Sequence, residues 1–275
     1  MRAISEMSTH MLSNCVAVFT DIDDTLTTDG LLPAAAYEAL EALTNAGFQV
    51  VPITGRPAGW CDMIARLWPV AGIVGENGAF YFSYDRQNKA MRSRFFADED
   101  ERRANRIRLE QLREQILREV PGTGIASDQQ YREADLAIDF CEDVPALPKT
   151  AVQHILDIFD KAGAVAKLSS IHVNGWFGDY DKLSMTRKFA NDILKIDIDA
   201  DRENIIFVGD SPNDGPMFGF FPNSCGVANV RDFDPSTFNL PTFVAPSKGG
   251  EGFVQIADRI LSTVPNRPER SVKHD

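Results

Sequence analysis

The sequence CVAVFTDIDDTLT, residues 15–27, decides the fold. Its apolar half, VAVF, lacks alternation and is rich in β-branched residues, which is typical of a strand buried on both faces of a sheet. Three carboxylates, Asp21, Asp23 and Asp24, follow within four positions. Two unit charges about 4 Å apart repel by roughly 4 kcal/mol at an effective dielectric of about 20. The cluster is therefore either a divalent-metal site or a solvated acidic turn, and this stretch alone leaves both readings open.

Length and composition are those of a globular protein with one large domain or two smaller ones. The chain has 275 residues, of which 44% are hydrophobic and 25% are charged. A formal net charge of −12 argues against nucleic acid or anionic membrane as a partner, because both require a basic surface. No stretch approaches the roughly 18 to 20 consecutive apolar residues of a membrane span. The four cysteines lack metal-ligand spacing and fit reduced thiols in a cytoplasmic protein.

Both ends of the chain are predicted to be flexible. Residues 1–14 have no apolar core of signal-peptide length, and we expect a short flexible leader there. Residues 265–275 are polar and punctuated by proline, which predicts a disordered tail.

Helix and strand patterns alternate up to residue 82 and again from residue 181. This alternation with short connections predicts an α/β fold with a Rossmann-like parallel-sheet core, built from residues 15–82 and 181–264. The periodicity predicts helices over 33–45, 57–67, 183–194 and 250–261, and strands over 48–53, 72–74, 205–208, 225–228 and 243–244.

Between these two parts, residues 83–180 read as a separate α+β module inserted into the core. Two amphipathic helices are predicted, over 100–120 and 149–162, together with a strand over 136–140. Residues 164–177 are predicted to form a strand pair or one long strand. Arginine and glutamate alternate along the first helix, which indicates a solvated outer face rather than a nucleic-acid patch.

Four polar clusters stand at the ends of predicted core elements: DIDDT, TGR, Lys182 and GDSPND. Ligands of open α/β sheets bind at the carboxyl ends of the strands, where three of these clusters are expected to converge. Lys182 instead marks a helix N-terminus, which favours anions. An acidic metal site beside a hydroxyl, a lysine and backbone donors suits phosphoryl transfer to a carboxylate nucleophile.

In these four clusters the chain resembles the haloacid dehalogenase superfamily of phosphatases. The position of the insertion, and GENGA before it, are similar to the branch with a large α/β cap, which includes Cof-type hydrolases and sucrose-phosphate, trehalose-phosphate and mannosyl-phosphoglycerate phosphatases. The motifs that carry the resemblance are Asp21-Ile22-Asp23-Asp24-Thr25, Thr54 in ITGR, Lys182 in YDK, and Gly209-Asp210 with Asn213-Asp214.

The resemblance implies a role for each motif. Asp21 would be the nucleophile that forms an aspartyl-phosphate, and Asp23 would protonate the leaving group and later activate water. Thr54 and Lys182 would hold the phosphoryl oxygens. Mg²⁺ would be bound by the carboxylates of Asp21 and Asp210 and by the backbone carbonyl of Asp23. Asp214 would be a further metal ligand or an anchor behind the ligands, and both roles stay open.

Substrate recognition is expected from the same motifs and from the inserted cap. The candidate substrate-binding residues are Thr54, Gly55, Arg56, Asn77, His172, Asn174, Lys182 and Asn213. For three residues in or next to these motifs, a structural role is also expected. Thr25 is expected to stabilise the turn, Asp24 to be solvated or bonded to backbone, and Arg56 to bind substrate or form an ion pair.

The segment SSIHVNGWF alternates in polarity, as a half-buried strand does. Ser170, His172, Asn174 and Trp176 fall on one face of the strand, and Ile171, Val173 and Phe177 fall on the other. We expect the polar face, with Asp139, to select the leaving group, and the loop Tyr131-Arg132-Glu133 is a further candidate. The alternative is a solvated face with a satisfied histidine.

The sequence therefore predicts a Mg²⁺-dependent phosphatase that hydrolyses a small phosphomonoester, a sugar phosphate, through an aspartyl-phosphate. The alternative enzyme is a phosphomutase of the phosphomannomutase type, and the remote alternatives are a non-enzymatic phosphoreceiver or a binding protein. The identity of the substrate and the oligomeric state are left open.

Overall fold

The computed structural model describes residues 1–169 and 171–263. The chain forms two compact units: unit 1 comprises residues 1–53, 68–72 and those from 187 onward, and unit 2 comprises residues 54–67 and 73–186. The two units do not have the predicted borders at residues 82 and 181, because unit 2 already begins at residue 54. The division into a core and an inserted module therefore stays a prediction. Ser170 and the predicted tail, 265–275, lie outside the described residues.

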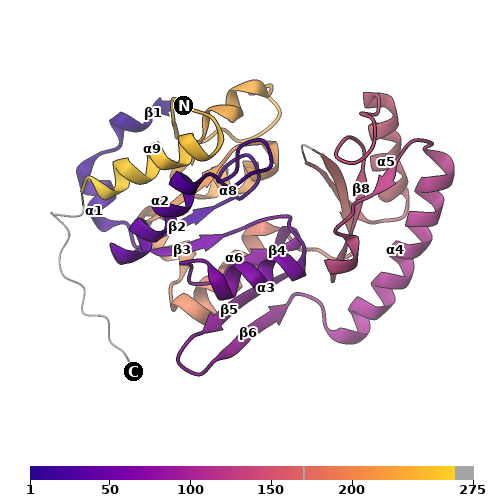
Figure 1. The fold of residues 1–275 in the computed structure, drawn as a ribbon, viewed down its shortest axis with the longest axis horizontal. Helices are drawn as coiled ribbons and strands as arrows, with labels where there is room; N and C mark the ends of the chain where they lie inside the picture. Colours follow the sequence, from indigo (N-terminus) through magenta and orange to yellow (C-terminus); the bar gives the residue numbers. More distant parts are fainter. Residues whose placement is uncertain (170, 264–275) are drawn as a thin grey trace. The chain divides into compact units, whose positions relative to one another are not determined.

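Unit 1 is built on a six-stranded sheet in which every neighbouring pair of strands is parallel (Figure 1). In spatial order its strands are β1 (Arg2–Ala3), β13 (Phe243–Val244), β12 (Asn223–Gly226), β11 (Ile205–Gly209), β2 (Ala17–Thr20) and β3 (Gln49–Pro52). β2 and β11 are buried along their whole length, as their apolar sequences predict. This sheet confirms the predicted Rossmann-like core.

Helices pack on this sheet through apolar stripes. Their bounds are α1 (Thr9–Asn14), α2 (Ala34–Asn45), α7 (Ile198–Asp201), α8 (Gly215–Phe220) and α9 (Gly249–Leu261). α2 and α9 lie side by side (Figure 1). On the face covered by α8, Phe207 contacts Phe218 at 5.5 Å between ring centroids, and Phe19 contacts Phe221 at 5.8 Å. These aromatic contacts attach the α8 region to the two strands that carry the candidate site.

The N-terminal residues are ordered, so the prediction of a flexible leader is wrong. β1 pairs with β13, and the guanidinium of Arg2 lies 4.3 Å from the centroid of the Phe243 ring. Met7 and Leu12 are buried, at 1% and 0% exposure. These apolar residues are too few and too irregularly spaced to form a periodic pattern, but burying them against unit 1 offsets the entropy of ordering the segment.

In unit 2, α3 (Ala58–Leu67) is followed by a three-stranded antiparallel sheet. Its strands are β4 (Ile73–Gly75), β5 (Phe80–Asp85) and β6 (Ala90–Phe95). The strand predicted at 72–74 is therefore present but does not join the parallel sheet: it pairs with β5. The short segment between them, Glu76–Gly78, reverses the chain direction with positive φ at all three residues. Glycine and asparagine tolerate this conformation, which is why ENG turns here.

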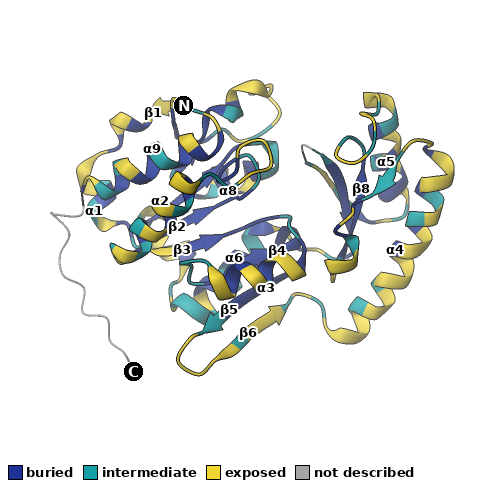
Figure 2. Cartoon of the chain, viewed as in Figure 1, coloured by how far each residue is buried: buried dark blue, intermediate teal, exposed yellow. Residues whose placement is uncertain are grey.

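The rest of unit 2 is a four-stranded antiparallel sheet covered by two helices. The strands, in order, are β7 (Gly124–Ile125), β8 (Asp135–Asp139), β10 (His172–Trp176) and β9 (Val165–Leu168), and the helices are α4 (Glu99–Glu119) and α5 (Lys149–Lys161). Leu112, Ile155, Phe159 and Val173 belong to one apolar cluster that joins helices and sheet. α4 is exposed over most of its length (Figure 2), in agreement with the predicted solvated face.

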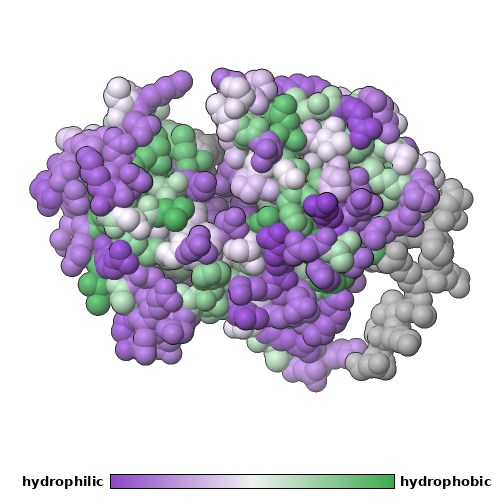
Figure 3. Space-filling model, turned by 180° about the vertical axis from the view of Figure 1, so that it is seen from behind, coloured by the Kyte–Doolittle hydropathy of each residue, from purple (hydrophilic) through white to green (hydrophobic). Residues whose placement is uncertain are grey.

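The helix α6 (Lys182–Phe189) leads from unit 2 into unit 1 and continues as a π-helical segment, Ala190–Leu194. Together they match the helix predicted at 183–194. Within the described residues, no helix is long and apolar enough to cross a membrane. Hydrophilic residues predominate on the face drawn in Figure 3, in keeping with the net charge of −12.

Candidate active site

The site begins where β2 and β11 end, side by side, at the carboxyl edge of the parallel sheet. Thr20 is paired with Val208, and the Asp21 N–H donates to the Val208 carbonyl at 2.9 Å. Asp21 and Asp210 are thus the residues that directly follow two neighbouring strands. The chain runs from β2 to β3 on one side and returns through β11 on the other, so this edge is a topological switch point, where open α/β sheets bind ligands.

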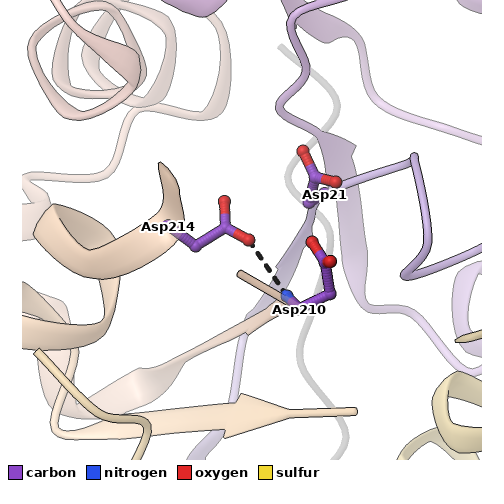
Figure 4. A group of neighbouring side chains, drawn as sticks. All are labelled: Asp21, Asp210 and Asp214. Atoms are coloured by element: carbon purple, nitrogen blue, oxygen red, sulfur yellow. Dashed lines mark hydrogen bonds between the residues drawn. The ribbon is translucent and has the colours of Figure 1, made fainter. Parts of the chain in front are cut away.

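Three buried carboxylates meet at this edge. Oxygens of Asp21, Asp210 and Asp214 all lie within 4.8 Å of one another (Figure 4). Asp214 is held in place because its Oδ2 accepts a hydrogen bond from the Asp210 N–H at 3.0 Å. A side chain at Gly209 would collide with the Asp214 carboxylate, so glycine is required there. The motif GDSPND therefore places two carboxylates beside Asp21.

This oxygen set fits a hard divalent cation. Carboxylate oxygens are the protein ligands that Mg²⁺ prefers, and enzyme sites usually supply one or two of them. The separation of the oxygens allows Asp21, Asp210 and Asp214 to bind one ion together. Burial of the three side chains, at 6%, 7% and 0% exposure, makes a compensating positive charge more important than at a solvated turn.

The turn after β2 is held by the Ile22 carbonyl and by Thr27. The Ile22 oxygen accepts from the N–H groups of Leu26, at 2.8 Å, and Thr27, at 3.0 Å. The Thr27 hydroxyl accepts from the Asp24 N–H at 2.9 Å. Thr25 is fully buried, and its hydroxyl finds no hydrogen-bond partner in the described part of the chain. The turn-stabilising hydroxyl is therefore Thr27, and the prediction that Thr25 has this role is wrong.

Asp23 and Asn213 are half-buried residues of the two loops that carry the carboxylates. Asp24, also half-buried, has φ of 57°, a left-handed conformation that aspartate tolerates. Their predicted roles, acid and base for Asp23 and substrate contact for Asn213, stay predictions.

The loop that contains Thr54 belongs to unit 2 and is bonded to the ENG segment. The Thr54 carbonyl accepts from the Asn77 N–H at 3.0 Å, and the Arg56 carbonyl accepts from the Glu76 N–H at 3.2 Å. The Thr54 hydroxyl accepts from the Arg56 N–H at 3.1 Å. A Cβ at Gly55 would lie 3.2 Å from the Asn77 amide, so the two loops touch there. The structure thus brings together four predicted residues: Thr54, Gly55, Arg56 and Asn77.

Arg56 and Lys182 are also residues of unit 2. The Arg56 guanidinium lies 4.4 Å from the Trp60 ring centroid and 4.0 Å from the Asp128 carboxylate. Lys182 is the first residue of α6 and is 5% exposed. The convergence of Lys182 and Thr54 with Asp21 stays a prediction.

The polar face of β10 is buried, which contradicts the alternative of a solvated sheet face. His172 and Asn174 are 3% and 5% exposed. The Asn174 amide donates to the Asp135 carboxylate at 3.0 Å, and His172 Nε2 lies 2.8 Å from a carboxylate oxygen of Glu142. Burial lowers the pKa of His172, and the Glu142 carboxylate acts in the opposite direction.

Asp139 has a structural explanation. Its carboxylate accepts hydrogen bonds from the N–H groups of Cys141 at 2.9 Å, Glu142 at 2.7 Å and Asp143 at 2.7 Å. It therefore closes the turn after β8, as aspartate commonly does. The role of His172 and Asn174 in selecting the leaving group stays a prediction. The carboxylate of Asp139 is already bonded to three backbone N–H groups, so this residue is a weaker candidate for that role.

Glu76 is a buried functional-site candidate that sequence reasoning missed. Its carboxylate, 0% exposed, accepts from the N–H groups of Ala58 at 3.0 Å, Glu133 at 2.9 Å, Ala134 at 2.6 Å and Asp135 at 3.2 Å. Ala58 begins α3, so one of these bonds stabilises a helix N-terminus. The motif GENGA draws attention to this residue, but its partners lie 18 to 59 positions away in the sequence.

Arg132 completes this buried network. Its Nε lies 3.0 Å from the Asp128 carboxylate, and its Nη1 lies 3.0 Å from the Asp135 carboxylate and donates to the Gly55 carbonyl at 3.1 Å. Burial raises the pKa of Glu76 to about 8, and the neighbouring Asp135 charge adds to the effect, while Arg132 and the backbone donors oppose it. The network joins the Thr54 loop to the loop before β8.

A family model matches the part of the chain that contains Asp21 and Thr54. Residues 18–119 match the family model of haloacid dehalogenase-like hydrolases. These residues belong to the haloacid dehalogenase-like hydrolases. The family resemblance and the hydrolase class predicted from the four motifs are thereby confirmed. No curated protein sequence matches the chain.

Solved structures share the fold of this chain over about nine-tenths of its length. A protein from Thermoplasma acidophilum is 20% identical, with a TM-score of 0.68, over 90% of this chain and 98% of that one. A putative HAD/COF-like hydrolase from Plasmodium vivax is 19% identical, with a TM-score of 0.64, over 94% and 99%. The sucrose-phosphatase from Synechocystis, in complex with sucrose and phosphate, is 14% identical, with a TM-score of 0.61, over 89% and 97%.

The cluster of Asp21, Asp210 and Asp214 predicts the outcome of a metal-binding measurement. Substitution Asp210→Asn removes one charged oxygen, so we expect Mg²⁺ affinity to fall at least about tenfold. Isothermal titration calorimetry of the folded variant against wild type measures this. Asp258→Asn, which changes an exposed aspartate of α9, is the control and is expected to bind as wild type does. Equal affinities for Asp210→Asn and wild type would contradict the site.

The raised pKa of Glu76 predicts how stability depends on pH. Between the ordinary value of 4.5 and about 8, the folded state keeps a proton that the unfolded state has released, so the free energy of unfolding falls as pH rises. One group in this state contributes a slope of about −1.4 kcal/mol per pH unit.

Substitution Glu76→Gln removes this contribution. We expect the difference in free energy of unfolding between wild type and variant to fall by about 1 kcal/mol per pH unit from about pH 5 to about pH 7.5. Urea unfolding at several pH values measures it, with Glu114→Gln, an exposed position of α4, as the matched control. A pH-independent difference would mean that Glu76 is ionised in the folded protein.

Proposed function

We propose that this chain is a Mg²⁺-dependent phosphatase that hydrolyses a small phosphomonoester, a sugar phosphate, through an aspartyl-phosphate intermediate. The observation that carries the proposal is the buried cluster of Asp21, Asp210 and Asp214 at the carboxyl end of the central strands. A carboxylate at this position can act as a nucleophile, and its two partners fit a metal that offsets phosphate charge.

Asp21 and Asp23 take part in both chemical steps, the formation of the aspartyl-phosphate and its hydrolysis. An oxygen of the Asp21 carboxylate attacks phosphorus, the bond from phosphorus to the substrate oxygen breaks, and Asp23 donates a proton to the departing alkoxide. A water molecule then attacks phosphorus while Asp23, now a carboxylate, takes its proton. The bond from phosphorus to Asp21 breaks, which releases inorganic phosphate and restores Asp21. The reaction consumes one water molecule and needs no other reactant.

The remaining residues hold the transferring group. Mg²⁺ held by the carboxylates of Asp21 and Asp210 and by the backbone carbonyl of Asp23 would neutralise charge on the phosphoryl oxygens. Asp214 would be a further ligand or an anchor behind the ligands. The Thr54 hydroxyl and the Lys182 ammonium would bind the other phosphoryl oxygens, and Asn213 would support the same group. Asp24 has no part in the chemistry.

A sugar phosphate is proposed as substrate on two grounds. Similar structures include the sucrose-phosphatase and a trehalose-6-phosphate phosphatase related protein. His172 and Asn174 form a buried polar face on β10, a surface of donors and acceptors that suits a hydroxyl-rich ligand. The net charge of −12 disfavours nucleic acid as a substrate, and the cytoplasm is the proposed setting.

The nucleophile is tested by Asp21→Asn. We expect hydrolysis of p-nitrophenyl phosphate with Mg²⁺ to fall by about 10³-fold or more, because an amide does not attack phosphorus, and chelation of the metal to reduce wild-type activity comparably. Asp24→Asn is the matched control: asparagine also tolerates the left-handed conformation, and full activity is expected. Retained activity in Asp21→Asn would refute the mechanism. With a sugar phosphate as substrate, an isomerised phosphate ester in place of inorganic phosphate would indicate a mutase.

Substrate selection is tested by His172→Ala after a panel of sugar phosphates and phosphoglycerate derivatives has identified the best substrate. We expect KM for that substrate to rise about tenfold, because a buried hydrogen-bonding group is lost, while kinetics with p-nitrophenyl phosphate stay unchanged. His154→Ala, at an exposed position of α5, is the control. An unchanged KM for the best substrate would show that His172 does not help to select the leaving group.

A further inference from the structure

The TGR motif, residues 54–56, lies in the irregular loop before α3, and each of its three carbonyls accepts a hydrogen bond from another part of unit 2. The carbonyls of Thr54 and Arg56 accept from backbone N–H groups of the ENG segment, at 3.0 and 3.2 Å. The middle carbonyl, that of Gly55, accepts from Nη1 of Arg132 at 3.1 Å. This third bond comes from a side chain 77 positions away in the sequence.

The guanidinium of Arg132 is held in one orientation. Its side chain is 2% exposed, and Nε and Nη2 donate to the two carboxylate oxygens of Asp128, at 3.0 and 3.2 Å. Nη1 donates to the Asp135 carboxylate at 3.0 Å as well as to the Gly55 carbonyl. A planar fork bonded to two carboxylates has little freedom to turn, so it presents an N–H group to Gly55 in a fixed direction.

The bond to Gly55 reaches the Thr54 hydroxyl through one peptide unit. The Gly55 carbonyl and the Arg56 N–H belong to the same planar peptide, so neither can turn without the other. The Arg56 N–H donates to the Thr54 hydroxyl at 3.1 Å. Because glycine leaves the adjoining peptide freer to rotate than other residues do, an external bond is needed to hold this plane. Arg132 supplies that bond, and the plane in turn orients the hydroxyl.

We propose that Arg132 is a positioning residue, which holds the Thr54 hydroxyl, through the peptide between Gly55 and Arg56, in the direction in which it binds the phosphoryl group. The inference rests on the proposed phosphatase function, in which Thr54 binds a phosphoryl oxygen. A donor held in place before the reaction stabilises the transition state without reorganisation. Arg132 therefore affects the hydrolysis of every substrate, whereas His172 affects the leaving group alone.

The test uses Arg132→Lys. Lysine keeps a positive charge between Asp128 and Asp135 but lacks the planar fork, so its ammonium cannot bond both carboxylates and the Gly55 carbonyl at once. We expect kcat/KM for p-nitrophenyl phosphate with Mg²⁺ to fall about tenfold or more, because the hydroxyl is no longer held in direction. The kinetics are measured at a temperature at which the unfolding curves show every variant to be folded.

The route through Thr54 is tested by combining Arg132→Lys with Thr54→Val, which removes the hydroxyl and keeps the shape of the side chain. In the Thr54→Val background we expect Arg132→Lys to lower kcat/KM by less than about twofold, because no hydroxyl is left to orient. A residue with a structural role alone would lower kcat/KM by the same factor in both backgrounds.

Phe159→Leu is the matched control for lost stability, because Phe159 is buried in the apolar cluster that joins α4 and α5 to the sheet of unit 2. We expect it to lower the unfolding temperature and to leave kcat/KM as in wild type. Three results would overturn the proposal: an unchanged kcat/KM in Arg132→Lys, the same factor in both backgrounds, or an equal loss of kcat/KM in Phe159→Leu.

Asp21→Asn, measured in the same assay, separates this inference from the function on which it rests. Wild-type hydrolysis that does not depend on Asp21 would refute the proposed function, and the role of Arg132 with it. Hydrolysis that depends on Asp21 but is unchanged in Arg132→Lys would overturn the role of Arg132 alone. If Arg132→Lys does not fold, Arg132→Gln combined with Asp128→Asn replaces it with the same expected results, since this pair removes one charge of each sign.

Discussion

Repulsion among buried carboxylates is the constraint on which unit 1 depends. Parallel pairing of β2 with β11 places Asp21 and Asp210 on adjacent strands, and Asp214 brings a third carboxylate to the same place. This arrangement is unfavourable unless positive charge is present, and the local structure holds it nonetheless. The Asp210 N–H fixes Asp214, and the absence of a side chain at Gly209 leaves it room. Buried like charges this close together lower the stability of the fold, and such arrangements are typical of functional sites.

The fold and the carboxylate cluster could be predicted because their signals are local. A buried parallel strand reads as a continuous apolar run, and the residues that follow it must reach the carboxyl edge of the sheet. Asp21 and Asp210 are therefore placed together by two short stretches of sequence, without knowledge of anything between them. The amphipathic helices α2, α5 and α9 were predictable for the same reason, because their 3.6-residue period is complete within a dozen residues.

The features that could not be predicted depend on contacts between distant residues. β1 exists because β13, more than 200 positions later, offers it an edge. β4 has the composition of a core strand, but the left-handed turn at 76–78 returns the chain beside it as β5. Of two threonines in one turn, backbone geometry rather than residue type assigns the bonding role to Thr27. From the sequence alone Glu76 would be expected at the surface, but in the structure the loop 133–135 surrounds its carboxylate.

The contacts of Glu76 also bear on how this protein could be recombined with its relatives. Cutting the chain at residues 83 and 180 follows the natural break in its sequence pattern, yet Glu76 and Gly55 lie outside that segment while their partners at 132–135 lie inside it. A module transplanted at those borders would leave a buried carboxylate behind and expose backbone donors that had matched it. The exchangeable part of this molecule is therefore the whole of unit 2, which includes the loop that carries Thr54.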